Sequence, residues 1–363
     1  MSLHKWVRPN VLALAGYVPG EQPSPRQTLI KLNTNENPFP PPEAVLTAIR
    51  ETSRGDRLRL YPEPSARLVR EAAAAAYGLS PEEIVVGNGS DDLLTMILRT
   101  FVDPGEGVAA PDPTYTLYAP LTQLQGGRFI PVPWAGGERF ELPISALADT
   151  GAKVIFLPRP NAPTGHVNSL EEVARLCQAA PGVVVLDEAY GDFAMDNGLP
   201  LLPDHDNLII TRSFSKSLSL AGLRIGLGFM SREIATQMHK VRDSYNLDAV
   251  AQAAATAALE NLSTCEKNTR IIRQERQRLT QNLQERGFQV IPSQANFILT
   301  TIPTGKRDGE GWLADLKTHG FLVRYFGSDP NLADKLRITI GTPEEMDRFL
   351  GVVDQLLENN QTG

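Results

Sequence analysis

Short runs of aliphatic and β-branched residues alternate with amphipathic stretches from about residue 84 onward. Alternation of this kind is typical of a mainly parallel sheet whose strands are joined by crossover helices. The pattern therefore predicts an α/β fold class. We expect strands at residues 84–86, 107–110, 153–157, 183–186, 207–211 and 223–229.

Helix signals lie between these runs. Residues 91–101 carry an amphipathic pattern that follows Ser90, and residues 170–178 carry one that follows Ser169. Serine is a favoured N-cap, because its side-chain oxygen accepts a hydrogen bond from a free amide of the first turn. We therefore expect both serines to cap their helices.

The pattern changes after about residue 230, where long helical stretches appear at 249–260 and 265–286. Gly287 follows the second stretch and is expected to close it, because glycine readily adopts the backbone conformation that ends many helices. Strand-like and helical pieces then alternate, which predicts a smaller α+β unit. Its strands are expected at 297–301, 321–325 and 336–340, and its helices at 312–319 and 344–358.

Composition and charge exclude several classes of protein. The chain has 363 residues, of which 42% are hydrophobic and 21% charged, as in an ordinary globular protein with a sizeable core. A formal net charge of -7 argues against a nucleic-acid-binding surface, although a local basic pocket for a small anion is compatible with it. No apolar run reaches the roughly 18 residues of a membrane span, so we expect no membrane association.

The two cysteines and five histidines show no metal or disulfide pattern. Cys177 and Cys265 lie far apart and form no CxxC, and the histidines are scattered. We therefore expect no metal site, incidental or solvated histidines, and a reducing, cytoplasmic environment.

The most informative segment surrounds Lys216. It follows the expected strand at 207–211, so it lies at the carboxyl edge of the sheet, where open α/β sheets bind ligands. Ser213, Ser215 and Arg224 can cradle a phosphate, while the lysine amine can attack an aldehyde. The alternative is a solvated lysine in a serine-rich turn.

A second segment ends the apolar strand at 183–186 with Asp187, Glu188 and, two residues on, Tyr190. A carboxylate at this edge can pair with a pyridinium nitrogen and keep it protonated. The alternatives are a helix cap or a metal ligand, and the latter is weak because no histidine or second carboxylate lies at suitable helical spacing.

A third segment, Arg159-Pro-Asn161-Ala-Pro163-Thr-Gly165, is a turn by composition. The three segments, in this order and spacing, resemble the aspartate-aminotransferase-like fold (fold type I) of pyridoxal 5′-phosphate enzymes. Within it the chain is most similar to the histidinol-phosphate aminotransferase family, over essentially its whole length. The further segments that carry the likeness are Leu32-Asn-Thr-Asn-Glu-Asn-Pro38, Tyr61-Pro-Glu63, Gly87-Asn-Gly-Ser-Asp91, Asp112-Pro-Thr-Tyr115, Phe321-Leu-Val-Arg324 and Leu336-Arg-Ile-Thr339.

The resemblance implies an architecture. It implies a mainly parallel seven-stranded sheet domain with a smaller α+β domain. We expect an N-terminal arm that begins the small domain at residues 1–42, a large pyridoxal-phosphate-binding domain at 43–255, and the small C-terminal domain at 256–363.

The resemblance also implies a role for each matching residue. Lys216 would bind the cofactor aldehyde covalently, Asp187 would pair with the ring nitrogen, Tyr190 would hydrogen-bond the phenolic oxygen and Tyr115 would stack on the ring. The phosphate would be held by Ser90, Asp91, Ser213, Ser215 and Arg224. The substrate would face Tyr17, Asn33, Arg324 and Arg337.

Tyr61 implies a partner, because in the family it reaches the phosphate of the neighbouring subunit's cofactor, so the site would need a homodimer. One position departs from the family pattern. The asparagine that usually precedes Pro-Thr-Gly, and contacts the phenolic oxygen, is replaced by Ala162. We expect Asn161, one residue earlier, to substitute for it.

The activity implied is ping-pong transfer of an amino group between L-histidinol phosphate and 2-oxoglutarate in L-histidine biosynthesis. The free Lys216 amine would move the proton, and Arg337, with Arg324 as a second charge, would bind the substrate phosphate or the glutamate α-carboxylate. The alternatives are an aromatic amino-acid aminotransferase or a threonine-phosphate decarboxylase on the same scaffold. A nicotinamide dehydrogenase is disfavoured, because only fragments of its glycine fingerprint occur.

Overall fold

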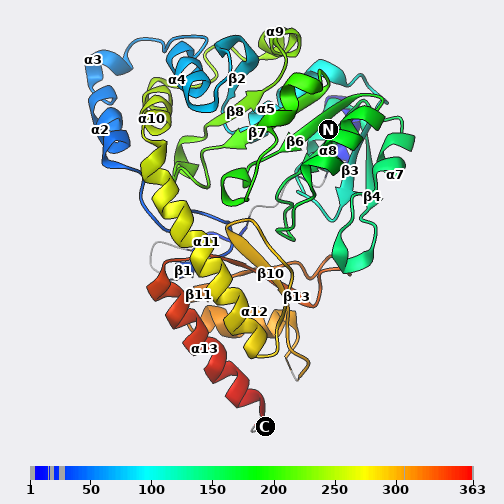
Figure 1. The fold of residues 1–363 in the computed structure, drawn as a ribbon, viewed down its shortest axis with the longest axis vertical. Coiled ribbons are helices and arrows are strands. Elements are labelled where there is room, and N and C mark those ends of the chain that lie inside the picture. The colour runs from blue at the N-terminus through cyan, green and yellow to red at the C-terminus, as the bar shows by residue number, and fades with distance from the viewer. Residues whose placement is uncertain (1–4, 15, 17–19, 24–28, 306, 362–363) are drawn as a thin grey trace.

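The computed structural model describes residues 5–14, 16, 20–23, 29–305 and 307–361, so Tyr17 lies outside the described residues. The chain forms two lobes, a larger one built on a seven-stranded sheet and a smaller one that holds the C-terminus (Figure 1). The 24-residue helix α11 (Leu262–Glu285) runs from one lobe to the other.

The large sheet is mainly parallel, as predicted. Only β8 runs against its neighbours, β2 and β7, while every other pair in this sheet is parallel. The strands lie in the order β2 (Ile84–Gly87), β8 (Gly226–Phe229), β7 (Leu208–Ser213), β6 (Val183–Asp187), β5 (Val154–Pro158), β3 (Gly107–Asp112) and β4 (Arg128–Pro133). The sequence pattern missed β4, because Pro131 and Pro133 cannot donate to a ladder and are tolerated only at such an edge.

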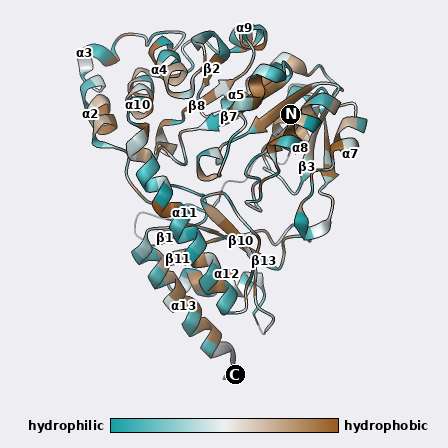
Figure 2. Cartoon of the chain, in the orientation of Figure 1, coloured by the Kyte–Doolittle hydropathy of each residue, from teal (hydrophilic) through white to brown (hydrophobic). Residues whose placement is uncertain are grey.

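The central strands are buried on both faces, which explains their continuous apolar runs. In β6, Val184 and Leu186 face one core, while Val183 and Val185 face the other. Figure 2 shows hydrophobic residues along strands in the middle of the large lobe and alternating hydrophilic and hydrophobic residues along the helices around them. One core is covered by α2 (Glu43–Thr52), α4 (Arg67–Tyr77), α7 (Ile144–Asp149), α8 (Leu170–Ala179) and α10 (Ala249–Glu260), the other by α5 (Ser90–Phe101), α6 (Tyr118–Gln125) and α9 (Arg232–Val241).

The two predicted serine caps have different outcomes. Ser169 caps α8, accepting from the amide of Glu172 at 3.2 Å while the Glu172 carboxylate accepts from the Ser169 amide. The prediction for Ser90 was wrong, because Gly89 is the N-cap of α5 and Ser90 is its first residue. Gly89 has φ +84°, and a Cβ there would lie 2.5 Å from the Arg224 guanidinium, so glycine alone fits this turn.

The small lobe combines a short N-terminal segment around residues 30–35 with the C-terminal part of the chain. Its four-stranded sheet has the order β12 (Arg324–Tyr325), β13 (Lys335–Thr339), β10 (Phe297–Thr301) and β9 (Gln289–Val290). A separate parallel pair joins β1 (Ile30–Lys31) to β11 (Phe321–Leu322), so the single strand predicted at 321–325 is divided between two sheets. Leu32 from the N-terminal segment and Trp312 from α12 share one core. The α-helices α12 (Gly309–Thr318) and α13 (Pro343–Gln361) pack in this lobe, whereas α1 (Pro9–Leu12) contacts α6 and α3 (Gly55–Leu58) lies beside α2 in the large lobe.

Helix α11 begins three residues earlier than predicted and ends at Glu285, with Arg286 as C-cap and Gly287 following at φ +84°. Within the described residues, no helix is long and apolar enough to cross a membrane. The same residues contain no group of three or more His, Cys, Asp or Glu side chains placed to hold a metal ion.

Candidate active site

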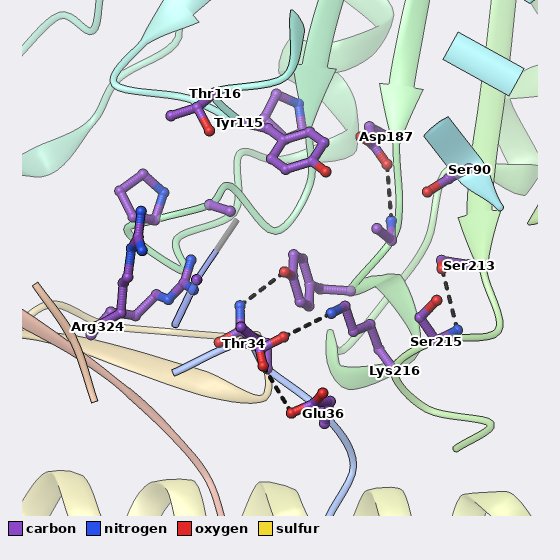
Figure 3. A pocket seen from close by; sticks show the side chains of 18 of the residues that line it. Thr34, Glu36, Ser90, Tyr115, Thr116, Asp187, Ser213, Ser215, Lys216 and Arg324 are labelled. Carbon is purple, nitrogen blue, oxygen red and sulfur yellow. Dashed lines mark hydrogen bonds between the residues drawn. The ribbon is translucent and has the colours of Figure 1, made fainter. Parts of the chain in front are cut away.

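A cleft lies between the two lobes, at the carboxyl ends of β5, β6 and β7 (Figure 3). This is the edge where an open α/β sheet binds ligands. Of the fourteen predicted site residues that the structure describes, twelve line this cleft: Asn33, Ser90, Asp91, Tyr115, Asp187, Tyr190, Ser213, Ser215, Lys216, Arg224, Arg324 and Arg337.

Lys216 extends into the cleft from the turn after β7. Its Nζ donates to the carbonyl oxygen of Thr34 at 3.1 Å and lies 5.7 Å from the ring centre of Tyr190 (Figure 3). Asn37 Nδ2 donates to the Lys216 carbonyl at 2.9 Å, and the next residue, Ser217, donates to Asp192. The chain on the C-terminal side of the lysine is therefore held, while its amine faces the open cleft.

Asp187 ends β6 as a buried carboxylate. It accepts hydrogen bonds from Tyr118 Oη at 2.8 Å, Thr211 Oγ1 at 3.1 Å and the Ala189 amide at 3.2 Å. Burial raises the pKa of Asp187, and these hydrogen bonds oppose that rise. No cationic side chain pairs with Asp187 among the described residues. The site therefore holds a buried carboxylate that has no counter-charge.

Tyr118 is a site residue that the sequence pattern missed. Its ring is fully buried and stacks on Phe156 at 4.5 Å, so in the sequence it is indistinguishable from a core aromatic. Burial, with a further contribution from Asp187, raises the pKa of Tyr118 well above its usual value. The phenol therefore remains a hydrogen-bond donor to Asp187 at physiological pH.

One wall of the cleft is built for an anion. Ser90 and Asp91 form the first turn of α5, whose backbone amides have no partner within the helix. Arg224 Nη1 donates to Ser215 Oγ at 3.1 Å, and Nη2 pairs with Asp91 Oδ2 at 3.1 Å. Gly226 keeps this wall open, because a Cβ there would lie 2.6 Å from the Ser90 nitrogen.

Asn161 does not line the cleft. Its side chain is fully buried, and its Nδ2 donates to Pro113 O at 3.1 Å and to Thr164 Oγ1 at 2.7 Å. Ala162, the next residue, lines the cleft instead. Tyr61 also lies elsewhere, 82% exposed and stacked on Tyr245 with ring centres 4.6 Å apart.

Two arginines stand opposite each other on the small-lobe side of the cleft. Arg324 in β12 is the direct antiparallel partner of Arg337 in β13. Both guanidinium groups lie over the ring of Phe326, at 5.4 and 5.5 Å from its centre, and Arg337 Nη2 donates to Asn33 O at 2.9 Å. No hydrogen bond or ion pair joins the Arg324 guanidinium to another described residue. Like charges facing each other across strands repel, so this wall favours an anion between them.

Asn35 and Phe326 are two further lining residues that were not singled out. Asn35 lies in the segment 32–38 that carried the family likeness, and it donates to Tyr190 Oη at 2.9 Å. Phe326 follows Arg324 by two residues and packs against both arginines. Asn35 could not be recognised from spacing, because Tyr190, through which it acts, is 155 positions away.

The buried state of His166 corrects the expectation of a solvated or incidental side chain. It stacks on Phe140 with ring centres 4.7 Å apart, and its Nδ1 lies 2.6 Å from Thr164 Oγ1. Burial lowers the pKa of His166 to about 3, so the ring is neutral at physiological pH.

Comparison with known proteins supports one family. The sequence model of the family described as aminotransferase class I and II matches residues 27–353. A histidinol-phosphate aminotransferase of Microcystis aeruginosa is 44% identical over 344 residues, which cover 95% of this chain and 96% of the relative.

Solved structures agree. A histidinol-phosphate aminotransferase of Sinorhizobium meliloti, in complex with pyridoxal-5′-phosphate, superposes with a TM-score of 0.85 at 28% identity and 98% coverage of both chains. A Thermus thermophilus aspartate aminotransferase shares the fold, with a TM-score of 0.78 at 24% identity, and covers 95% of this chain and 99% of its own. The predicted fold class, an α/β fold of type I, is confirmed.

Proposed function

Because the chain belongs to the class I and II aminotransferases, we propose that it transfers an amino group between L-histidinol phosphate and 2-oxoglutarate, using pyridoxal 5′-phosphate. The products are imidazole-acetol phosphate and L-glutamate, in the biosynthesis of L-histidine. The names of the relatives support this substrate, and the cofactor named for the Sinorhizobium meliloti structure supports this cofactor.

The donor set of the cleft fits this cofactor. The first turn of α5, Ser213, Ser215 and Arg224 offer amides, hydroxyls and a guanidinium to a phosphate. Gly226 leaves the room that a larger residue would fill. Asp187, a buried carboxylate without a cation, suits a protonated pyridine nitrogen. Lys216 brings a primary amine to the middle of the cleft.

When bound, pyridoxal 5′-phosphate supplies an aldehyde that exchanges with substrate amines and a protonated ring that draws electrons from the substrate Cα, and its alternation between aldehyde and amine forms makes the kinetics ping-pong. With the cofactor bound, Lys216 Nζ would take the proton from the substrate Cα and deliver it, from the same face, to the carbon of the former aldehyde group. The Thr34 carbonyl, 3.1 Å from this nitrogen, directs it toward the cleft. Asp187 keeps the ring nitrogen charged, and Tyr115 lies against the cleft beside Asp91.

The observation that carries the substrate assignment is the facing pair Arg324 and Arg337. A phosphate dianion has the charge to satisfy both guanidinium groups, whereas a single carboxylate has the charge for one. Arg337, held by the Asn33 carbonyl, is placed to bind the glutamate α-carboxylate in one half-reaction and to share the substrate phosphate with Arg324 in the other.

The test is a panel of single half-reactions. The purified protein, loaded with cofactor, is mixed with histidinol phosphate, phenylalanine or threonine phosphate, and the visible cofactor band is followed. We expect rapid bleaching with histidinol phosphate and recovery on adding 2-oxoglutarate. Faster bleaching by phenylalanine would indicate an aromatic aminotransferase, and release of carbon dioxide from threonine phosphate would indicate a decarboxylase.

We also propose that the enzyme works as a homodimer with Tyr61 reaching the partner's cofactor phosphate. Tyr61 lies outside the cleft of its own chain, in an exposed apolar group with Leu58, Leu60 and Tyr245. An apolar group of this kind is typical of a surface covered by another chain. Light scattering should give twice the chain mass, and Tyr61→Phe should weaken cofactor binding without dissociating the dimer.

The cytoplasm is the compartment we propose. Cys177 and Cys265 are free and buried, as is common in proteins of reducing compartments. Fractionation of cells that express a tagged chain should recover it with cytoplasmic markers.

A further inference from the structure

Asn35 is a buried amide in the wall of the cleft, on the N-terminal segment. It is 1% exposed and has φ +59°, a left-handed conformation that asparagine tolerates better than most residues. Its Nδ2 donates to Tyr190 Oη at 2.9 Å, which is the one hydrogen bond found for this hydroxyl among the described residues. Asn35 therefore determines in which direction the Tyr190 hydroxyl can donate its hydrogen.

A closed set of hydrogen bonds with Thr339 fixes the direction of that amide. The Asn35 backbone N–H donates to Thr339 Oγ1 at 3.0 Å, so the hydroxyl hydrogen of Thr339 is free to be the donor in its 3.0 Å contact with Asn35 Oδ1. Oδ1 is thereby committed to Thr339, and Nδ2 faces Tyr190. Asn296 Nδ2 also donates to the Asn35 carbonyl at 3.0 Å, which holds the backbone.

The consequence for Tyr190 is a fixed proton direction. Since its oxygen accepts from Asn35, its own hydrogen must point elsewhere, and Tyr190 lines the cleft beside Lys216. A second amide donor from the neighbouring turn is missing. Ala162 has no polar side chain, and both Nδ2 hydrogens of Asn161 are used by Pro113 and Thr164.

We propose that Asn35 is a positioning residue, which keeps the Tyr190 hydroxyl hydrogen aimed at the phenolic oxygen of the bound cofactor. The inference rests on the proposed function, because it places pyridoxal 5′-phosphate in this cleft. Donation to the phenolic oxygen stabilises its anionic form, so it lowers the pKa of the lysine-bound cofactor. Asn35 therefore helps to set the pH at which the cofactor changes protonation.

The test is a pH titration of the visible absorption of the bound cofactor. Asn35→Gly removes the amide while glycine accepts the positive φ. We expect the cofactor pKa to rise by about one unit, the effect of losing a hydrogen bond to a charged oxygen. Tyr190→Phe should raise it similarly, and the double variant should show no further rise.

Two other variants separate positioning from simple structural support. Thr339→Val removes the hydroxyl that fixes the orientation of the Asn35 side-chain amide, while Asn35 itself is unchanged. This variant should therefore also raise the cofactor pKa. Asn296→Ala removes only the bond to the Asn35 carbonyl, so it should lower the melting temperature and leave the cofactor pKa unchanged.

The outcomes distinguish this inference from the proposed function. A wild-type protein that gives no visible cofactor band overturns the proposed function. A normal wild-type band, with the same pKa in Asn35→Gly and Thr339→Val, overturns the role of Asn35 alone. If the glycine variant does not fold, the Thr339→Val titration decides, since it leaves Asn35 in place.

Discussion

Tyr118 Oη donates a 2.8 Å hydrogen bond to Asp187 Oδ2 at the floor of the cleft. Asp187 must be ionised to pair with a pyridinium nitrogen, yet burial raises its pKa. Tyr118→Phe removes a donor that opposes this rise, so the Asp187 pKa should rise further. A hydrogen bond to a charged group contributes about 1.5–3 kcal/mol, so cofactor affinity should fall by about 10-fold or more.

The pH dependence of cofactor affinity tests whether Tyr118 acts through the Asp187 pKa. In the wild type, affinity should fall as the pH falls through the Asp187 pKa, because the neutral acid cannot pair with the ring cation. In Tyr118→Phe the same fall should begin at a higher pH. Equilibrium dialysis of the cofactor at several pH values measures both, and an affinity curve identical to that of the wild type would exclude a role for Tyr118.

Lys216→Ala should reduce turnover by about 10⁴-fold, because it removes the group that moves the proton at the substrate Cα. Cofactor should still bind, since Asp187 and the anion-binding wall remain. Lys216→Arg is the matched control: it keeps a cation near the Thr34 carbonyl, but a guanidinium cannot act as the base. Turnover and bound cofactor, measured on the same samples, separate the two effects, and appreciable activity in either variant would contradict the assignment.

Arg324→Ala should raise the KM for histidinol phosphate by about 10- to 100-fold, the effect of losing a charge-assisted hydrogen bond. The glutamate half-reaction should change less, because Arg337 is held independently by Asn33. Arg324→Lys retains the charge, so its KM for histidinol phosphate should lie between those of the wild type and Arg324→Ala. Half-reaction kinetics with both substrates test this, and an equal loss for both would place Arg324 outside the phosphate site.

His166 should make the fold sensitive to acid. Its pKa is about 3 when folded, against an ordinary value of 6.5, so the unfolded chain binds more protons between these values. Burial of the neutral His166 ring therefore costs no stability from protonation above pH 6.5. The free energy of unfolding falls as the pH drops from 6.5 toward 3. The loss attributable to His166 should reach about 2 kcal/mol at pH 5.

His166→Gln is the comparison for this effect. It has no imidazole to protonate, so its free energy of unfolding should depend less on pH between 6.5 and 5 than that of the wild type. Urea denaturation at fixed pH values measures the slope. Equal slopes in the two proteins would mean that His166 is not buried as a neutral ring.

The sequence pattern predicted those parts of the site that follow directly from strands. Asp187 ends one strand of the parallel sheet and Lys216 follows the next, and the carboxyl ends of such strands meet at one edge. The parts it missed depend on tertiary contacts. Tyr118 has the spacing of a core aromatic, and the orientation of Asn35 is set by Thr339, which is 304 positions away.

Local geometry also decided whether Asn161 could take the role of the family asparagine that Ala162 replaces. Asn161 lies one position from Ala162, but its amide turns into the protein toward Pro113 and Thr164. Sequence spacing carries no information on such a turn. The same limit applies to β4. Its prolines argue against a strand in the sequence, and they are tolerated because β4 lies at the edge of the sheet.

The pairing of β1 with β11 has a consequence for how the protein is made. The N-terminal strand and the wall that carries Asn35 find their partners only in the last part of the chain to be synthesised. At about 5–20 residues per second, the segment waits on the order of tens of seconds on the ribosome. The large sheet can form during this interval, whereas the cofactor cleft can close only after Thr339 has emerged.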